Sequence, residues 1–188
     1  MPINPRRKTI SSPNTILAID PSTRDLGIAI FVDDDLAYYT LKTIRPRHPR
    51  RALLQTVSEV IERLIRDFEP STLAIEHVPL VQKSEALLSV VADEIRITAA
   101  SAGLVVKEYD PRQVRSRICE SFEATNAQTA LRLCQRYPEL SQYLNGRSKS
   151  HARYYGHLFA AVAVGLVCSQ ETVDPEQPVI HTQQQVLF

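Results

Sequence analysis

The strongest constraint on this fold is a single carboxylate that stands between two apolar runs. The first run, 16–19, ends at Asp20, and after a short polar turn Gly27 opens the second run. Apolar residues on both sides predict a buried central strand with its carboxylate at the strand's end. A later apolar run, 72–75, ends in the same way at Glu76. Two strands that each bring an acid to one sheet edge predict a divalent-metal site; a turn-capping role for either acid is the alternative.

Length and composition fit one intracellular domain. The chain has 188 residues, enough for one sizeable core, and its 22 Lys and Arg nearly balance its 21 Asp and Glu. Any affinity for nucleic acid must therefore come from local basic patches. No apolar run is long enough to cross a bilayer or resembles a signal peptide, which predicts a soluble, cytoplasmic protein with no membrane partner. Three cysteines, without disulfide or metal spacing, are expected in the core of a protein from a reducing compartment: Cys119, Cys134 and Cys168.

The pattern along the chain predicts alternating strands and helices. A basic arm (1–13) is expected to be disordered, a domain covers 14–169, and a polar tail covers 170–188. The order β-β-β-α-β-α-β-α predicts a three-layer α/β sandwich: a five-stranded mixed sheet with helices on both faces. Strands are expected at 15–20, 27–32, 36–44, up to residue 76 and at 104–109; helices are expected at about 51–68, 83–102, from 111, 126–136 and 151–168.

Four segments, in this order, resemble the RuvC-type Holliday junction resolvases of the RNase H-like superfamily. Residues 16–27 (ILAIDPSTRDLG) are similar to the family's first motif, and 73–78 (LAIEHV) to its second. Residues 82–88 (QKSEALL) and 106–114 (VKEYDPRQV) fit the elements that follow. The resemblance implies an RNase H-like fold and an endonuclease that cuts branched DNA, works as a homodimer and uses Mg²⁺ or Mn²⁺.

The last helix departs from the family's pattern. Where the family has an Asp, preceded by an Asp or a His, the aligned residues here are His157 and Tyr154. Imidazole suits Mn²⁺ better than Mg²⁺, so weaker Mg²⁺ binding is expected. The alternative is that His157 is a buried structural histidine and that the site is inactive. The implied catalytic and metal-binding set is Asp20, Glu76 and His157, with His151 and Tyr154 as less favoured neighbours.

Basic residues supply the candidate DNA contacts, although a charged helix face is often only solvated. Arg112 and Arg115 share one face of the predicted helix, and loop 45–51 is rich in arginine. Nothing in the sequence predicts reading of base edges, which fits recognition of DNA shape. His77, beside Glu76, is expected to face the other way and to be structural. The candidate DNA-binding residues are Lys83, Arg112, Arg115, Arg47 and Arg50.

Three functions remain open at this stage. The first is a structure-selective endonuclease on branched DNA, with the apolar stripe of helix 83–102 packing either on a second copy or on its own sheet. The second is a non-catalytic protein of the same fold that binds branched DNA or scaffolds a nucleoprotein complex. The third, an actin-like nucleotide-binding domain, is disfavoured because five glycines leave no second phosphate loop and the chain is too short for two lobes.

Overall fold

The computed structural model describes residues 14–44, 50–78, 86–144 and 149–173, without the side chains of 149–153 and 172–173. Its five strands form one mixed sheet in the order β3-β2-β1-β4-β5. Pairing is antiparallel from β3 to β1 and parallel from β1 to β5. The strands are β1 (Thr15–Asp20), β2 (Asp25–Val32), β3 (Asp35–Thr43), β4 (Thr72–Glu76) and β5 (Val105–Tyr109).

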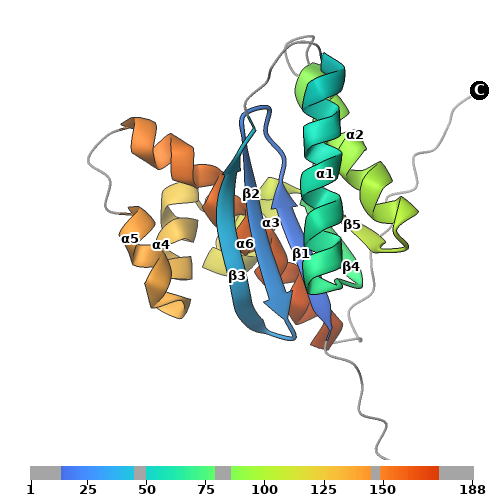
Figure 1. Ribbon diagram of the computed structural model, residues 1–188. Helices are drawn as coiled ribbons and strands as arrows, with labels where there is room; N and C mark the ends of the chain where they lie inside the picture. The colour runs from blue at the N-terminus through green and yellow to red at the C-terminus, as the bar shows by residue number, and fades with distance from the viewer. Residues whose placement is uncertain (1–13, 45–49, 79–85, 145–148, 174–188) are drawn as a thin grey trace, which may run out of the picture.

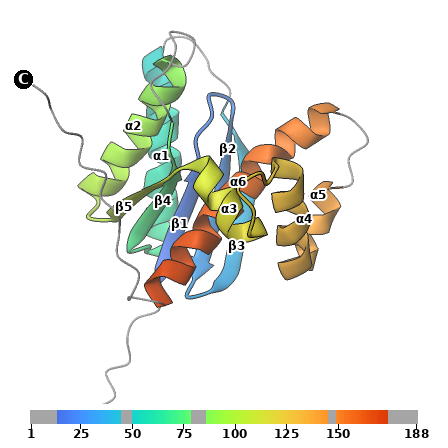
Figure 2. The same cartoon turned by 180° about the vertical axis from the view of Figure 1, so that it is seen from behind.

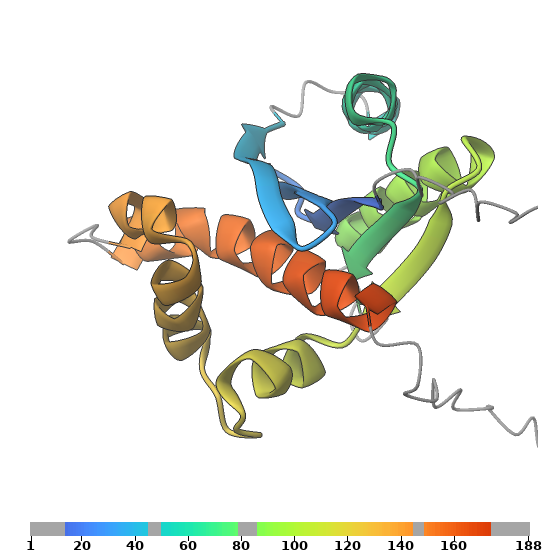
Figure 3. The same cartoon turned by 90° about the horizontal axis from the view of Figure 1, so that it is seen from below.

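Helices cover both faces of the sheet, which makes three layers (Figure 3). One face carries α1 (Arg50–Phe68) and α2 (Ala86–Ser101), which stand in front of the sheet in Figure 1. On the other face α6 (Lys149–Val173) crosses the sheet, as Figure 2 shows from behind. Three further helices and a 3-10 turn pack on the α6 side: α3 (Pro111–Cys119), α4 (Asn126–Arg136), η2 (Pro138–Leu140) and α5 (Ser141–Leu144).

The alternation of side chains along the strands builds a separate core on each face. In β1, which is buried throughout, Leu17 and Ile19 pack under α1 and α2, whereas Ile16 and Ala18 pack under α6. Small residues on the α6 face allow that helix to lie close to the sheet. A Cβ on Gly165 of α6 would overlap the ring of Phe31 and the methyl group of Ala18.

The predicted sandwich is confirmed, with differences at element ends. β2 begins at Asp25, two residues before the predicted start, and the short segment 138–144 is helical where no element was predicted. The apolar stripe of α2, including Val91 and Ile95, packs into the chain's own core. Predictions for the arm 1–13 and for the tail beyond 173 lie outside the described residues. No helix among the described residues is long and apolar enough to cross a membrane.

The start of α3 at Pro111, where a helix was predicted to begin, is set by its cap. The Asp110 carboxylate accepts hydrogen bonds from the backbone N–H groups of Arg112 (2.8 Å) and Gln113 (3.0 Å), and Pro111 occupies the first helical turn. This cap fixes how α3 leaves the end of β5. It therefore fixes where the arginines of α3 stand.

Helix α6 continues to Val173, five residues beyond its predicted end at 168. The reason lies in contacts from other elements to Glu171. Its carboxylate accepts a hydrogen bond from the Tyr109 hydroxyl (2.7 Å) and one from the Arg117 guanidinium. Lys107 adds a cation 3.9 Å away. Residues from β5 and α3 thus hold the last turn of α6 in place.

We expect Glu171→Ala to destabilise the protein by about 1–3 kcal/mol, because it removes charge-assisted hydrogen bonds and leaves Tyr109 without this acceptor. Urea unfolding followed by circular dichroism measures the change. Glu123→Ala, at an exposed glutamate in the loop before α4, is the matched control and should change stability by less than about 0.5 kcal/mol. Equal stabilities of the two variants would show that Glu171 does not hold the end of α6.

Candidate active site

The two predicted acids lie side by side at one edge of the sheet. β1 and β4 pair in parallel with Ile19 opposite Ile75, so Asp20 and Glu76 are the next residues on adjacent strands. Ile19 and Ile75 belong to the core under α1 and α2. Because side chains alternate, Asp20 and Glu76 turn to the opposite face, which α6 covers. The prediction that two strands bring these acids to one edge of the sheet is confirmed, and the two strands are neighbours.

Burial and mutual repulsion make these two carboxylates costly to ionise together. Burial, with a further contribution from the charge of Asp20, raises the pKa of Glu76 to about 8, and the nearby Arg115 guanidinium opposes the shift. Burial also raises the pKa of Asp20 above its ordinary value, against the lowering effect of its hydrogen bond to His157. Arg115 and His157 only partly compensate the two acids, and raised pKa values of this kind are typical of functional sites.

His157 reaches the site from α6 and contacts Asp20 directly. Its Nδ1 lies 2.5 Å from Oδ2 of Asp20. This hydrogen bond raises the pKa of His157, despite the opposing effect of burial. The nitrogen that faces Asp20 is therefore engaged with a carboxylate, and a metal ion could be bound only through the other ring nitrogen, Nε2.

The position of His157 depends on Gly27. Gly27 pairs with Asp20 in the sheet, and the backbone carbonyl of His157 lies against its Cα. A Cβ at position 27 would overlap that carbonyl oxygen. The glycine that opens the second apolar run is thus required for α6 to approach the edge that carries Asp20.

We expect Gly27→Ala to displace α6, with a loss of about 1–3 kcal/mol of stability and of the His157–Asp20 contact. The matched control is Gly156→Ala in the same helix, where a Cβ meets nothing within 4 Å and should stabilise by about 0.5–1 kcal/mol. Thermal unfolding measures stability, and the NMR resonances of the His157 ring report its contact. Unchanged resonances in Gly27→Ala would contradict the close approach.

The remaining predicted site residues are only partly brought together. Arg115 is half-buried near Glu76, and its Nε donates to the carbonyl of Ala124 (3.1 Å). Arg112 is exposed on the same helix, and Arg50 begins α1 and donates to the carbonyl of Ala86 (3.4 Å). The other candidates, Lys83, Arg47 and the side chain of His151, lie outside what the structure describes.

Two neighbours of Glu76 and His157 point away from the acids. His77 contacts the carboxylate of Glu108 through Nδ1 (3.1 Å), which is consistent with the predicted structural role. The hydroxyl of Tyr154 lies 3.5 Å from that of Thr43. Its ring also lines a pocket beside β3. Tyr154 is therefore engaged elsewhere than with Asp20.

Sequence reasoning missed Asp25 and Thr43. The Thr43 hydroxyl donates to Asp25 (2.8 Å), and the charge of Asp25 contributes to the raised pKa of His157. Asp25 lies within the first motif, five residues after Asp20 in the sequence, and this position could have marked it as a candidate site residue. Thr43 could not be found in this way, because only the pairing of β2 with β3 brings it opposite Asp25.

The donors suit a divalent cation in part. Two desolvated carboxylates on one sheet edge are oxygen ligands of the kind that Mg²⁺ and Mn²⁺ accept, and a cation would offset their repulsion. Across the residues that the structure describes, however, no three His, Cys, Asp or Glu side chains are arranged as a ready-made metal-binding group. The fit therefore rests on Asp20 and Glu76, with His157 held against Asp20.

Comparison with known proteins identifies the family. The family model described as crossover junction endodeoxyribonuclease RuvC matches residues 16–148. A relative of that name from Akkermansia muciniphila is 31% identical over 122 residues, 61% of this chain and 72% of the relative. A Thermus thermophilus RuvC structure aligns with TM-score 0.67 and 18% identity, covering 85% of this chain and 95% of that one. T. thermophilus RuvC in complex with a Holliday junction substrate aligns with TM-score 0.65 and 19% identity, covering 81% and 91%. The chain belongs to the RuvC family of crossover junction endodeoxyribonucleases.

Proposed function

We propose that this protein is a divalent-metal-dependent, structure-selective endodeoxyribonuclease that resolves branched DNA such as Holliday junctions. The observation that carries the proposal is the pairing of Asp20 with Glu76 at the ends of adjacent parallel strands, in a chain of this family. Both acids are largely withdrawn from solvent, and the charge of Asp20 raises the cost of ionising Glu76. A cation bound between the two acids would favour their ionised forms and would offset their repulsion against a phosphodiester.

Asp20 and Glu76 would hold the cation, Mg²⁺ or Mn²⁺, and His157 would complete the site through Nε2 or by holding Asp20. When bound, the cation would stabilise the developing charge on the phosphate and activate water. The hydrogen bond from His157 fixes the orientation of the Asp20 carboxylate. An imidazole in place of a third carboxylate supports tolerance of Mn²⁺.

Positive charge for the DNA backbone would come from α3. Arg115 lies near Glu76, and the exposed Arg112 stands one turn earlier on the same helix. Arginine binds phosphate oxygens in a bidentate manner, which positions a strand without reading its bases. Arg50 at the start of α1 is a second, separate candidate; Lys83 and Arg47 remain sequence-based candidates.

A homodimer in the cytoplasm is the form in which we propose that the enzyme works. A four-way junction has near two-fold symmetry, so symmetric cleavage needs two sites related by a two-fold axis. An isologous dimer supplies these two sites. The main apolar stripe of α2 packs into the core of the same chain. The dimer interface is therefore expected to use residues other than Val91 and Ile95.

Asp20→Asn is expected to reduce junction cleavage about 100-fold or more while preserving binding, because it removes a metal ligand and relieves repulsion against phosphate. Cleavage of a synthetic four-way junction with Mg²⁺ or Mn²⁺, alongside a gel-shift assay without divalent cation, measures both effects. Asp67→Asn, at an exposed aspartate near the end of α1, is the matched control for loss of an aspartate charge. Cleavage at the parent rate by Asp20→Asn would refute the assignment of Asp20.

A second candidate function is binding of branched DNA without cleavage. Two observations favour it: Nδ1 of His157 is occupied by Asp20, and no three-ligand metal group is formed among the described residues. In that case the histidine would serve as a permanent partner that partly neutralises a buried acid. The two functions make opposite predictions for a carboxylate at position 157.

His157→Asp is expected to raise Mg²⁺-dependent cleavage and to lower any preference for Mn²⁺, because it supplies an oxygen ligand and a further negative charge. His157→Asn is the control of similar size without the charge. Cleavage rates in each metal, with thermal unfolding measured with and without cation, distinguish the outcomes. A variant that is destabilised by a few kcal/mol, inactive and not rescued by metal would favour the DNA-binding function.

A further inference from the structure

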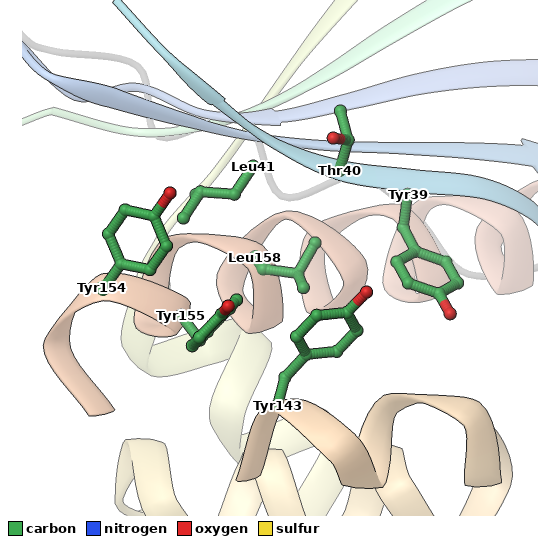
Figure 4. Close-up of a pocket in the computed structure, with 7 residues that line it drawn as sticks. All are labelled: Tyr39, Thr40, Leu41, Tyr143, Tyr154, Tyr155 and Leu158. Carbon is green, nitrogen blue, oxygen red and sulfur yellow. The ribbon is translucent and has the colours of Figure 1, made fainter. Parts of the chain in front are cut away.

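Four tyrosines line a pocket between the edge strand β3 and the start of α6. The cavity has a volume of about 210 Å³, and Figure 4 shows its walls, with β3 on one side and α5 and α6 on the other. Of the seven tyrosines in the chain, four are gathered here from three elements. The lining residues are Tyr39, Thr40, Leu41, Tyr143, Tyr154, Tyr155 and Leu158.

The four rings form a continuous series of aromatic contacts. The Tyr154 and Tyr155 rings meet edge to face, with centroids 5.0 Å apart at 82°. Tyr155 and Tyr143 lie 4.9 Å apart with a tilt of 43°, and Tyr143 meets Tyr39 at 6.0 Å and 86°. Such spacings are those of favourable aromatic pairs, so the rings hold one another in fixed orientations. The pocket therefore has pre-ordered aromatic walls.

The chemistry of the lining selects the class of ligand. All seven lining residues are uncharged, and the polar atoms of their side chains are hydroxyl groups. A phosphate would find no cation among them, whereas a flat, neutral ring would find aromatic faces and hydroxyl partners. Base–aromatic stacking tolerates any base, because every base presents a π-face. A nucleobase meets all these conditions.

The pocket adjoins the candidate active site. Leu158, which lines it, directly follows His157, and Tyr154 precedes His157 by three residues, about 4.5 Å along the helix axis. The Tyr154 hydroxyl contacts that of Thr43, which donates to Asp25. The charge of Asp25 in turn acts on His157. Pocket and site are thus connected through one helix turn and one chain of polar contacts.

We propose that this pocket stacks an unpaired nucleobase from a nucleotide next to the phosphodiester held at Asp20 and Glu76. The inference rests on the proposed nuclease function and adds to it a place for one base. A base can enter a concave pocket only when it has left the duplex stack, which costs least at a branch point. Tyr154, 40% exposed, is the ring that an entering base meets first.

The test measures binding to a four-way junction in EDTA, with the bases flanking the branch removed one at a time by abasic substitution. For the parent protein, loss of the stacked base should weaken binding by roughly 5- to 150-fold. In Tyr154→Leu the same abasic site should have no effect beyond about two-fold, whereas Tyr154→Phe should respond like the parent. Tyr38→Leu is the matched control: Tyr38, on β3, is 38% exposed like Tyr154 but packs on Phe68 and does not line the pocket.

A second measurement locates the base directly. Junctions that carry 5-iodo-2′-deoxyuridine beside the branch are irradiated, and mass spectrometry identifies the cross-linked residue. Cross-links to Tyr154 or Tyr143 are expected. The inference would be overturned if the parent protein and Tyr154→Leu both bound the junction fully and lost the same affinity at each abasic site. It would also be overturned if cross-links formed only outside the pocket. Either result would leave the nuclease function intact. Failure of the parent protein to bind the intact junction would overturn the proposed function and the inference together.

Discussion

The close approach of α6 to the sheet is the contact on which the rest of the structure depends. It is possible because two glycines stand where a side chain would collide: Gly27 beneath the carbonyl of His157, and Gly165 against Phe31. Alanines on the sheet, such as Ala18 and Ala74, have short side chains that let α6 lie close to the sheet along the rest of the interface. The helix is thereby fixed at both ends of its crossing, and the side chain of His157 is delivered to Asp20. The geometry of the site is thus set by a close contact between the backbones of α6 and β2.

The same contact imposes an electrostatic cost. Asp20 and Glu76 are buried beside each other, and burial raises the pKa of both. His157 and Arg115 supply partial compensation, one through a hydrogen bond and the other through its nearby charge. A fold selected only for stability would have apolar residues in place of these acids. The residue before each acid, Ile19 or Ile75, is a buried apolar residue of this kind. The retained acids are therefore best understood as a functional feature that the core tolerates.

The parts of this site that could be predicted from sequence are those fixed by local pattern and strand pairing. Apolar runs that end in Asp20 and Glu76 predict two strands with their acids at one edge of the sheet, and the structure places the two strands side by side. The atom through which His157 makes contact could not be predicted, because it depends on the depth of α6 against Gly27. The tyrosine pocket was missed for a related reason: its residues are far apart in sequence and meet only through packing. The end of α6 was misplaced because its partners belong to β5 and α3.

Placement of pocket residues and of His157 on one helix has a consequence for selectivity. A single turn of α6 separates Tyr154 from His157, so the distance between a stacked base and the bound phosphate is fixed. An intact duplex holds its bases inside the stack. It can place one base in the pocket and a phosphate at the acids only at the free-energy cost of extruding that base. A branch point, where pairing is already interrupted, can satisfy both at lower cost. On the proposed function, preference for branched DNA then follows from the spacing between the pocket and the acids that His157 contacts, with no need to read base edges.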